Sequence, residues 1–321
     1  GLAILPGQNS EKYILLTAHA DSVLSEDIDH TVQLHTNTVI GPGLAENSLG
    51  LAVLATLPMF LEKLNINLNS GLILMGNVHS VGWGNLEGIR FFLENTKLPI
   101  RAGICIEGAQ LGRLSYSSIS MLRGEVTCKV PDNHQWTTFG SANAVILLNQ
   151  VISKILRIPI PSQPLTRIIL GQVMGGTSFN QIAQKAYLRF ECRSEVPGIT
   201  EKIGQAIKDI CMEVSSKSGT NVELAVVATR SGGGLPFNHP LPQLVRRIHN
   251  TLTIKSEIEP TVSELATFIS KNIPAITVGM TKAEYINTER ETLEVEPMFK
   301  GLAQLLAIIM AVDEGICDGH R

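Results

Sequence analysis

Three short apolar segments, each followed directly by polar residues, constrain the fold of this chain more than any other feature of its sequence. They span residues 13–18, 72–75 and 101–106, and the patterns between them predict helices over residues 49–61 and 85–93. Strands that alternate with helices form a βαβ sheet, and the polar residues after each strand then meet at one edge. We therefore predict an α/β fold with its functional residues at the carboxyl ends of these strands.

The pattern changes after Gly112 and indicates an inserted second domain. Its predicted order is strand, helix, strand, strand, helix, strand, over residues 114–130, 141–155, 166–173, 186–192, 200–215 and 222–228. This βαββαβ order is typical of a ferredoxin-like unit. Helices over residues 240–251 and 297–310, with a strand over residues 275–278, then complete the first domain. The predicted domains are residues 1–112 plus 230–321, and the inserted residues 113–229.

The composition excludes several classes of protein. The chain has 321 residues, of which 44% are hydrophobic and 17% charged, so it can bury a large core and is not a disordered tail. A formal net charge of −3 lacks the basic excess of a general nucleic-acid binder. No apolar run reaches the roughly 18 residues that a membrane span needs. Neither nucleic acid nor a membrane is therefore expected as a partner.

The cysteines indicate the compartment. There are five, an odd number without a C-x-x-C pair, and they do not form a disulfide framework. A reducing compartment is the simpler interpretation, and we predict a cytoplasmic protein. Because the chain begins at Gly1 rather than Met and leads almost at once into a strand, we also expect that upstream sequence is missing.

Three residues at the predicted sheet edge could bind a metal ion. His19 follows the first strand, Glu46 precedes a helix and Glu107 ends the third strand. Asp21 could orient the imidazole and raise its basicity. Taken singly, each residue has an ordinary explanation, as a strand-end histidine bonded to backbone or a carboxylate at a helix start. Their convergence favours a metal site. By contrast, His249 on the predicted helix 240–251 is expected to be exposed.

Several segments resemble one enzyme family. LLTAHADSV, GPGLAENSLGLAVLA and AGICIEG are similar to the zinc-binding core of the aminoacylase, peptidase T, carboxypeptidase G and desuccinylase family of co-catalytic metallopeptidases. VTCKVPDNHQW and GGTSFNQIAQKAYLRFECRSE resemble its lid, and GGGLPFNHPL and NIPAITVGM match later segments. The resemblance implies a mixed-sheet zinc-exopeptidase-like α/β domain with an inserted ferredoxin-like lid. It covers nearly the whole chain, without the family's N-terminal portion.

The resemblance implies that one half of the family's metal centre is retained. The first-metal histidine and its supporting aspartate match His19 and Asp21. Two aspartate ligands, one of them bridging, fall on Glu46 and Glu107. A histidine and two carboxylates could still hold one divalent ion, zinc or manganese, in an altered geometry.

The other half of the metal centre is replaced. The family's catalytic glutamate falls on His79, and its two remaining ligands fall on Ser80 and Asn287. Neutral serine and asparagine oxygens are poor zinc ligands, so the second metal site is predicted to be empty. If the remaining half of the centre has also lost metal binding, no metal cofactor is expected.

Residues on the substrate side match the family better. The resemblance implies that His134 stabilises a developing oxyanion, that Asn180 and Arg193 hold an amide and a carboxylate, and that Gly233 lies in a substrate-binding loop. Their alternatives are a packed loop histidine, a turn amide, an ion pair with a neighbouring glutamate, and a tight glycine turn. The implied partners are a second copy of the chain, bound through the lid domain, and a small peptide or acylated amino acid.

Three functions remain open. The first is a metallopeptidase-like protein that has lost dinuclear zinc hydrolysis and binds a small carboxylate- or amide-bearing ligand. The second is an active amidohydrolase or peptidase that uses a single metal at His19, Glu46 and Glu107, with His79 as base. The third is a structural subunit that does not use the pocket. Because a lost general base typically lowers the rate by about 10² to 10⁴, the first is favoured.

Overall fold

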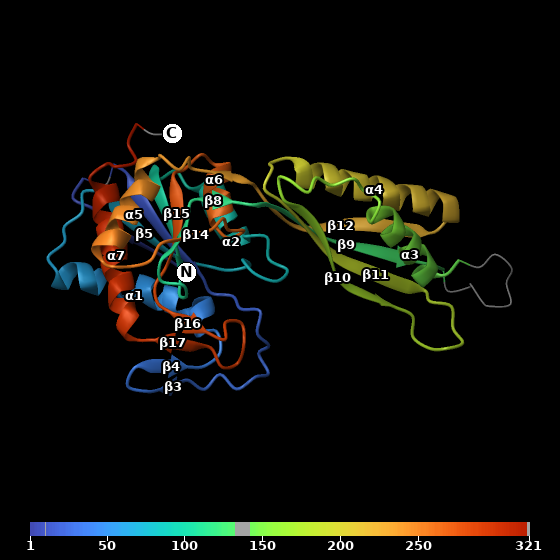
Figure 1. Cartoon of the computed structure of the whole chain (residues 1–321), viewed down its shortest axis with the longest axis horizontal. Helices are drawn as coiled ribbons and strands as arrows, with labels where there is room; N and C mark the ends of the chain where they lie inside the picture. Colours follow the sequence, from blue (N-terminus) through green and yellow to red (C-terminus); the bar gives the residue numbers. More distant parts are fainter. Residues whose placement is uncertain (10, 132–141, 320–321) are drawn as a thin grey trace. The chain divides into compact units, whose positions relative to one another are not determined.

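The computed structural model describes residues 1–9, 11–131 and 142–319 of the chain. They form two compact units (Figure 1). Gly1–Ser118 and Gly234–Arg321 make the first unit, and Ile119–Gly233 makes the second. All the predicted metal ligands belong to the first unit.

A mixed seven-stranded sheet is the centre of the first unit. Its strands lie in the order β1 (Leu2–Leu5), β5 (Gly71–Asn77), β2 (Tyr13–His19), β6 (Ile100–Glu107), β15 (Ala275–Gly279), β7 (Arg113–Ser115) and β14 (Glu257–Ile258). β5, β2, β6 and β15 run parallel, whereas β1 pairs antiparallel with β5 and β7 with β15. The predicted strands are confirmed. Because β2 and β6 are neighbours, their carboxyl ends lie side by side.

Two groups of helices cover this sheet (Figure 1). On one face lie α1 (Leu49–Lys63), α5 (Pro240–Thr251) and α7 (Glu296–Asp313), and on the other α2 (Glu87–Asn95) and α6 (Leu265–Ser270). The alternation along β2 supplies both cores, since Ile14 and Leu16 face the first group and Leu15 the second. A strand that is buried on both faces is apolar throughout, which explains why it can be recognised in the sequence.

A second sheet in the first unit is not predicted by the sequence. Its strands lie in the order β16 (Ala283–Glu284), β17 (Thr292–Glu294), β4 (Thr38–Ile40) and β3 (Gln33–Leu34). Strands of two or three residues show no period of hydrophobicity, so only tertiary contacts define them. Two other short strands, β13 (Gly233–Gly234) and β14, are not predicted for the same reason, whereas β8 (Ser117–Ser118) lies within the extended segment predicted over residues 114–130.

The second unit has the predicted order of strands and helices. Its antiparallel sheet lies in the order β10 (Thr166–Gly175), β11 (Lys185–Ser194), β9 (Ser120–Lys129) and β12 (Asn221–Arg230). The helices α3 (Ala144–Ile155) and α4 (Ile199–Ser218) share one core with it. The helix start predicted at Ser141 lies outside the described residues. α3 begins after Asn143, whose side chain accepts a hydrogen bond from the Val145 amide.

The structure corrects the expectation for His249. The residue is fully buried, with Nε2 2.8 Å from Gln304 Oε1 and Nδ1 2.8 Å from Ser256 Oγ. Gln304 belongs to α7, so the imidazole faces the neighbouring helix rather than solvent. Burial lowers the pKa of His249, and the two hydrogen bonds offset the desolvation of its ring.

One helical run among the described residues, Leu44–Lys63, is long and apolar enough to cross a membrane by length and composition alone. It joins the short helix η1 (Leu44–Ser48) to α1. The inner face of α1 buries Val53, Leu54 and Leu57 in the core of the first unit. A core helix of a large α/β domain can have this length and composition, so the run is only a weak indication of a membrane span.

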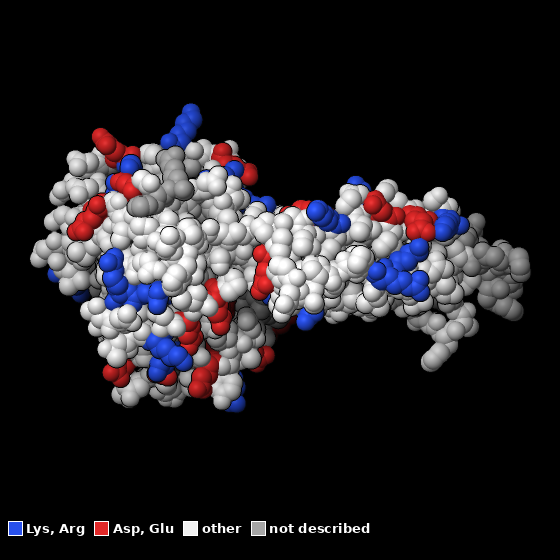
Figure 2. Space-filling view, turned by 45° about the horizontal axis from the view of Figure 1, so that its top comes forward, with Lys and Arg blue, Asp and Glu red and all other residues white. Residues whose placement is uncertain are grey.

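Charged side chains of both signs are interspersed on the face shown in Figure 2. With 26 Lys and Arg against 29 Asp and Glu, the chain has no basic excess that would attract a polyanion. The absence of a nucleic-acid partner stays a prediction from charge.

Gly301 permits a close contact between α7 and the residue that follows β15. A Cβ atom at this position would lie 2.0 Å from the backbone oxygen of Met280. We predict that Gly301→Ala destabilises the protein by about 1–3 kcal/mol, because overpacking outweighs the roughly 1 kcal/mol that alanine gains over glycine in a helix. Thermal unfolding measures the change. Gly171→Ala, where the nearest atom is 3.7 Å away, is the control, and a higher Tm for Gly301→Ala would contradict the packing argument.

Candidate metal centre

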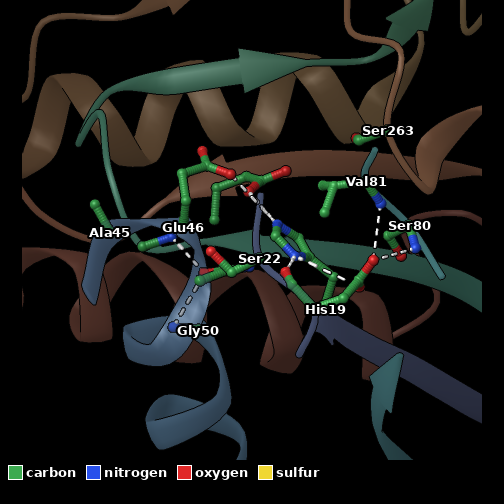
Figure 3. A network of polar contacts seen from close by, with 12 residues as sticks. His19, Ser22, Ala45, Glu46, Gly50, Ser80, Val81 and Ser263 are labelled. Atoms are coloured by element: carbon green, nitrogen blue, oxygen red, sulfur yellow. Dashed lines mark hydrogen bonds and ion pairs between the residues drawn. The ribbon is translucent and has the colours of Figure 1, made fainter. Parts of the chain in front are cut away.

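His19, the last residue of β2, is the centre of a polar cluster (Figure 3). Its Nδ1 lies 2.8 Å from the backbone oxygen of Asp21. A carbonyl oxygen only accepts hydrogen bonds, so Nδ1 is the donor and Nε2 is the nitrogen that can bind a cation. Nε2 lies 3.4 Å from Glu46 Oε2 and 3.9 Å from Glu107 Oε2. One nitrogen and two carboxylate oxygens therefore converge.

The side chain of Asn47 brings Glu46 to the end of β6. Both residues belong to η1, which follows a turn in the chain. Asn47 Nδ2 donates to the backbone oxygen of Ile106 at 2.7 Å, and Oδ1 accepts from the Gly108 amide at 2.8 Å. These two partners flank Glu107 in the sequence. One carboxamide therefore holds the segments that carry the two glutamates next to each other.

Asp21 supports the cluster through its backbone and its carboxylate. Its Oδ1 lies 3.9 Å from His19 Nδ1, too far for a hydrogen bond, so the carbonyl oxygen rather than the carboxylate orients the ring. Oδ2 accepts hydrogen bonds from the amides of Ser80 at 2.7 Å and Val81 at 2.9 Å (Figure 3). The carboxylate therefore holds the loop that follows β5.

Buried negative charge dominates the electrostatics of the cluster. Burial alone lowers the pKa of His19, but the hydrogen bond with Glu46 and the charges of Glu264 and Glu107 outweigh it and raise the pKa to about 10. Burial and the charge of Glu46 raise the pKa of Glu107 to about 7, against the opposing charge of Arg113. Without a metal, the site therefore keeps a proton at neutral pH where a cation would bind.

The donor set fits one divalent cation. One ligand atom from each of His19, Glu46 and Glu107 lies within 4.8 Å of the others. Zinc is bound by histidine nitrogen and carboxylate oxygen in sites with three protein ligands, and carboxylates also suit manganese. Glu107 Oε2 is buried and accepts no hydrogen bond, which leaves this oxygen available to a cation. The structure thus brings together the three residues that the sequence predicts as metal ligands.

The positions assigned to a second metal offer no anionic donor. His79 is exposed, has a positive φ of 59°, and is not among the described residues whose ligand atoms converge. The backbone amide of Ser80 donates to Asp21 Oδ2. The backbone amide of Asn287 donates to Glu291 Oε1 at 2.8 Å. Hydroxyl and carboxamide oxygens are not typical zinc ligands.

Two buried glutamates near this site, Glu264 and Glu291, are not predicted from the sequence. Glu291 is fully buried, and its carboxylate accepts the amides of Ala45 at 2.7 Å and Asn287 at 2.8 Å. Glu264 is 3% exposed, and its charge acts on His19. They stand in the segments TERET and SELATF, which are typical of a polar turn and a helix start. No local signal marks either residue as buried.

The predicted substrate-binding residues belong to the second unit. His134 lies outside the described residues. Asn180 is exposed, and its Oδ1 accepts from a neighbouring hydroxyl at 3.3 Å. Arg193 Nε donates to Glu191 Oε1 at 2.5 Å, so in this structure Arg193 forms an ion pair with a neighbouring glutamate. Gly233 has a φ of 128°, a conformation that favours glycine. Ligand binding by these four residues stays a prediction.

Comparison with known proteins identifies the fold. No family model and no curated protein matches the sequence. Among solved structures, aminopeptidase PepT from Bacillus cereus is similar at 17% identity and a TM-score of 0.72, over 97% of this chain and 84% of that chain. The di-peptidase Dug1p from Saccharomyces cerevisiae is similar at 12% identity and a TM-score of 0.76, over 98% and 82%. A dinuclear metal binding peptidase of the M20 family from Bacillus subtilis is similar at 15% identity and a TM-score of 0.63, over 98% and 85%.

The chain has the fold of the M20 peptidases. The resemblance found in the motifs is thereby confirmed at the level of fold, with its mixed α/β architecture. Identities of 12–17% with these M20-fold structures do not carry residue roles from one chain to another. The chemistry of the site depends on the side chains that this chain itself carries.

Glu291 is expected to stabilise the two segments whose backbone amides it accepts, at Ala45 and at Asn287. We predict that Glu291→Ala lowers the free energy of unfolding by about 2–4 kcal/mol, because two amides lose their acceptor. Urea unfolding measures this difference. The exposed Glu294 provides the control Glu294→Ala. Equal stability of the two variants would show that the Glu291 carboxylate does not hold these segments.

Proposed function

We propose that this protein binds a single divalent cation and a small ligand bearing a carboxylate or amide, and that it has lost dinuclear zinc hydrolysis. The convergence of one nitrogen and two carboxylate oxygens from His19, Glu46 and Glu107 carries the proposal. The M20 fold supports the use of a divalent metal, since one similar structure is described as a dinuclear metal binding peptidase. Zinc and manganese are the candidates.

The proposed loss of the second cation rests on charge. Ser80 and Asn287 stand where the family resemblance places an acidic and a histidine ligand. Neutral oxygens would leave a second dication with Glu46 as its main anionic ligand, and that carboxylate already faces His19 at 3.4 Å. A single site near His19 satisfies the donors that are present.

His19, Glu46 and Glu107 would have different roles in binding the cation. A bound zinc or manganese ion would supply Lewis acidity toward a carbonyl oxygen of the ligand. His19 would offer Nε2, with its ring oriented by the backbone oxygen of Asp21 at 2.8 Å. Glu46 and Glu107 would supply negative charge. His79 stands where the family resemblance places a catalytic glutamate, so binding without fast turnover is the expected outcome.

Small peptides or acylated amino acids are the proposed ligands. The similar structures described as aminopeptidase PepT and di-peptidase Dug1p support this class. The Arg193 side chain is 44% exposed, and a guanidinium can bind a carboxylate with two parallel hydrogen bonds. His134, Asn180 and Gly233 complete the proposed ligand-binding set.

An active single-metal amidohydrolase is the alternative. The exposure of His79 favours it, because an accessible imidazole stands next to Ser80, whose amide is bonded to Asp21 beside the metal ligands. A histidine can act as a general base near neutral pH. The two proposals differ in turnover and agree on the metal.

We also propose a homodimer that forms through the second unit, as a lid domain would. Leu148, Val151 and Ile155 of α3 are buried against their own sheet, so part of the apolar surface predicted for pairing is used within the unit. Val145 and Ile146 are 44% and 57% exposed and support pairing through the outer side of this helix. Cytoplasmic residence is supported by the five free cysteines.

The metal content tests the proposed site. We predict about one zinc or manganese ion per wild-type chain after equilibrium dialysis, and none above background for His19→Ala, which loses the nitrogen donor. Plasma mass spectrometry counts the ions. His30→Ala, at an exposed histidine, is the matched control. Two ions per wild-type chain would contradict a single site.

Turnover separates the two proposals. Metal-loaded wild-type protein is expected to show no detectable hydrolysis of dipeptides, tripeptides or acylated amino acids above a metal-only blank. Hydrolysis that disappears in both His19→Ala and His79→Ala, while His30→Ala keeps it, would establish the active amidohydrolase instead.

Metal affinity is expected to rise with pH. Since the pKa of His19 is about 10, metal binding displaces a proton at every pH below that value. Glu107, with a pKa of about 7, adds a second displaced proton in acid. The logarithm of the zinc affinity should therefore rise by about one per pH unit between pH 7.5 and 8.5 and more steeply below pH 7. Calorimetry in two buffers of different ionisation enthalpy counts the protons, and a pH-independent affinity would exclude this competition.

A further inference from the structure

Glu264 is a buried carboxylate without a partner. The residue is 3% exposed, and its Oε1 accepts no hydrogen bond. None of the ion pairs found in the described part of the chain involves it. A buried carboxylate without an ion pair and without a full set of hydrogen bonds is desolvated at a cost to the stability of the fold. Packing therefore does not explain the presence of this side chain.

Capping of the following helix does not explain the buried Glu264 side chain either. Glu264 precedes α6, a helix of six residues, and its side chain makes no capping hydrogen bond. The Thr267 amide is bonded instead to the backbone oxygen of Glu264 at 2.9 Å. A capping carboxylate would accept an amide of the first turn and would ordinarily be exposed.

The charge of Glu264 acts on the metal centre. It influences His19 and Glu107, and also Cys105 within β6. The geometry agrees, because α6 packs on β6 and β15 on the face of the sheet opposite α1. Figure 3 shows the adjacent Ser263 beside the cluster. Glu264 therefore belongs to the segment that covers the sheet on the face opposite α1.

The cluster as a whole carries more negative than positive charge. Its carboxylates are those of Asp21, Glu46, Glu107 and Glu264. The opposing groups are the imidazole of His19 and the guanidinium of Arg113, which acts on Glu107. Asp21 and Glu46 are half-buried, and Glu107 and Glu264 are buried. An excess of negative charge with little access to water is the arrangement that a dication would neutralise.

We infer that Glu264 is a further residue of the cation site, whose buried and unpaired carboxylate strengthens the binding of a divalent cation without being one of its ligands. The inference rests on the proposed function, since it concerns the same cation. Glu264 is not in the group whose ligand atoms lie within 4.8 Å of one another, so its charge acts from behind the ligands. The negative charge of Glu264 is unfavourable in the metal-free fold, and it would attract a bound cation.

Glu264→Gln tests this inference, because it keeps the shape of the side chain and removes the charge. Dissociation constants for zinc and manganese are measured by calorimetry on the whole chain, and Tm is measured on the metal-free chain. We expect binding weaker by about 10- to 100-fold. The metal-free Tm should be unchanged or a few degrees higher, because an unpaired charge is no longer buried. Glu259→Gln, at an exposed glutamate, should change neither quantity.

A second variant, Glu264→Met, removes the charge together with the polar atoms and should weaken metal binding to a similar extent. An affinity of Glu264→Gln within about twofold of wild type would overturn the inference and leave the proposed function intact. A metal-free Tm that falls in both variants would assign a structural role to Glu264 and overturn the inference. A wild-type chain that binds neither ion would overturn the proposed function and the inference together.

Discussion

The concentration of buried and half-buried carboxylates around His19 is the constraint on which the rest of the site depends. Like charges in a shared low-dielectric environment repel one another, and each has also lost part of its hydration. The sheet nevertheless holds His19 and Glu107 together because β2 and β6 are neighbours, and Asn47 adds Glu46 to them. The fold thus enforces a charge density that mobile side chains would avoid. A bound cation is the simplest group that relieves it.

The carboxylates of this region differ in how they are satisfied, and the difference separates two roles. Glu291 accepts two backbone amides and Asp21 Oδ2 accepts two more, so both hold loops in place. Glu107 Oε2 and Glu264 Oε1 are buried without a hydrogen bond, and so is the other oxygen of Asp21, Oδ1. Oxygens that bond to amides stabilise the metal-free fold, whereas unpaired oxygens destabilise it and gain from a cation. This division is consistent with the proposed single cation site.

The sequence predicts the framework well and the interior polar groups poorly. His19 and Glu107 could be nominated because strands buried on both faces are recognisable, and parallel neighbours place their carboxyl ends together. Glu264, Glu291 and His249 could not be recognised, since their burial depends on which helix or loop covers them. An acidic residue before an apolar helix is ordinarily an exposed helix-start residue. Only the tertiary structure shows that Glu264 is enclosed.

Anomalous X-ray diffraction from crystals of the whole chain soaked in zinc, recorded at the zinc absorption edge, tests the central claim most directly. The account predicts one anomalous peak, at about 2.0–2.2 Å from a nitrogen of His19 and from carboxylate oxygens of Glu46 and Glu107. Two peaks about 3.5–4 Å apart would instead show that a dinuclear centre survives, with ligands not identified here. An empty cluster in fully soaked crystals would contradict the account as well.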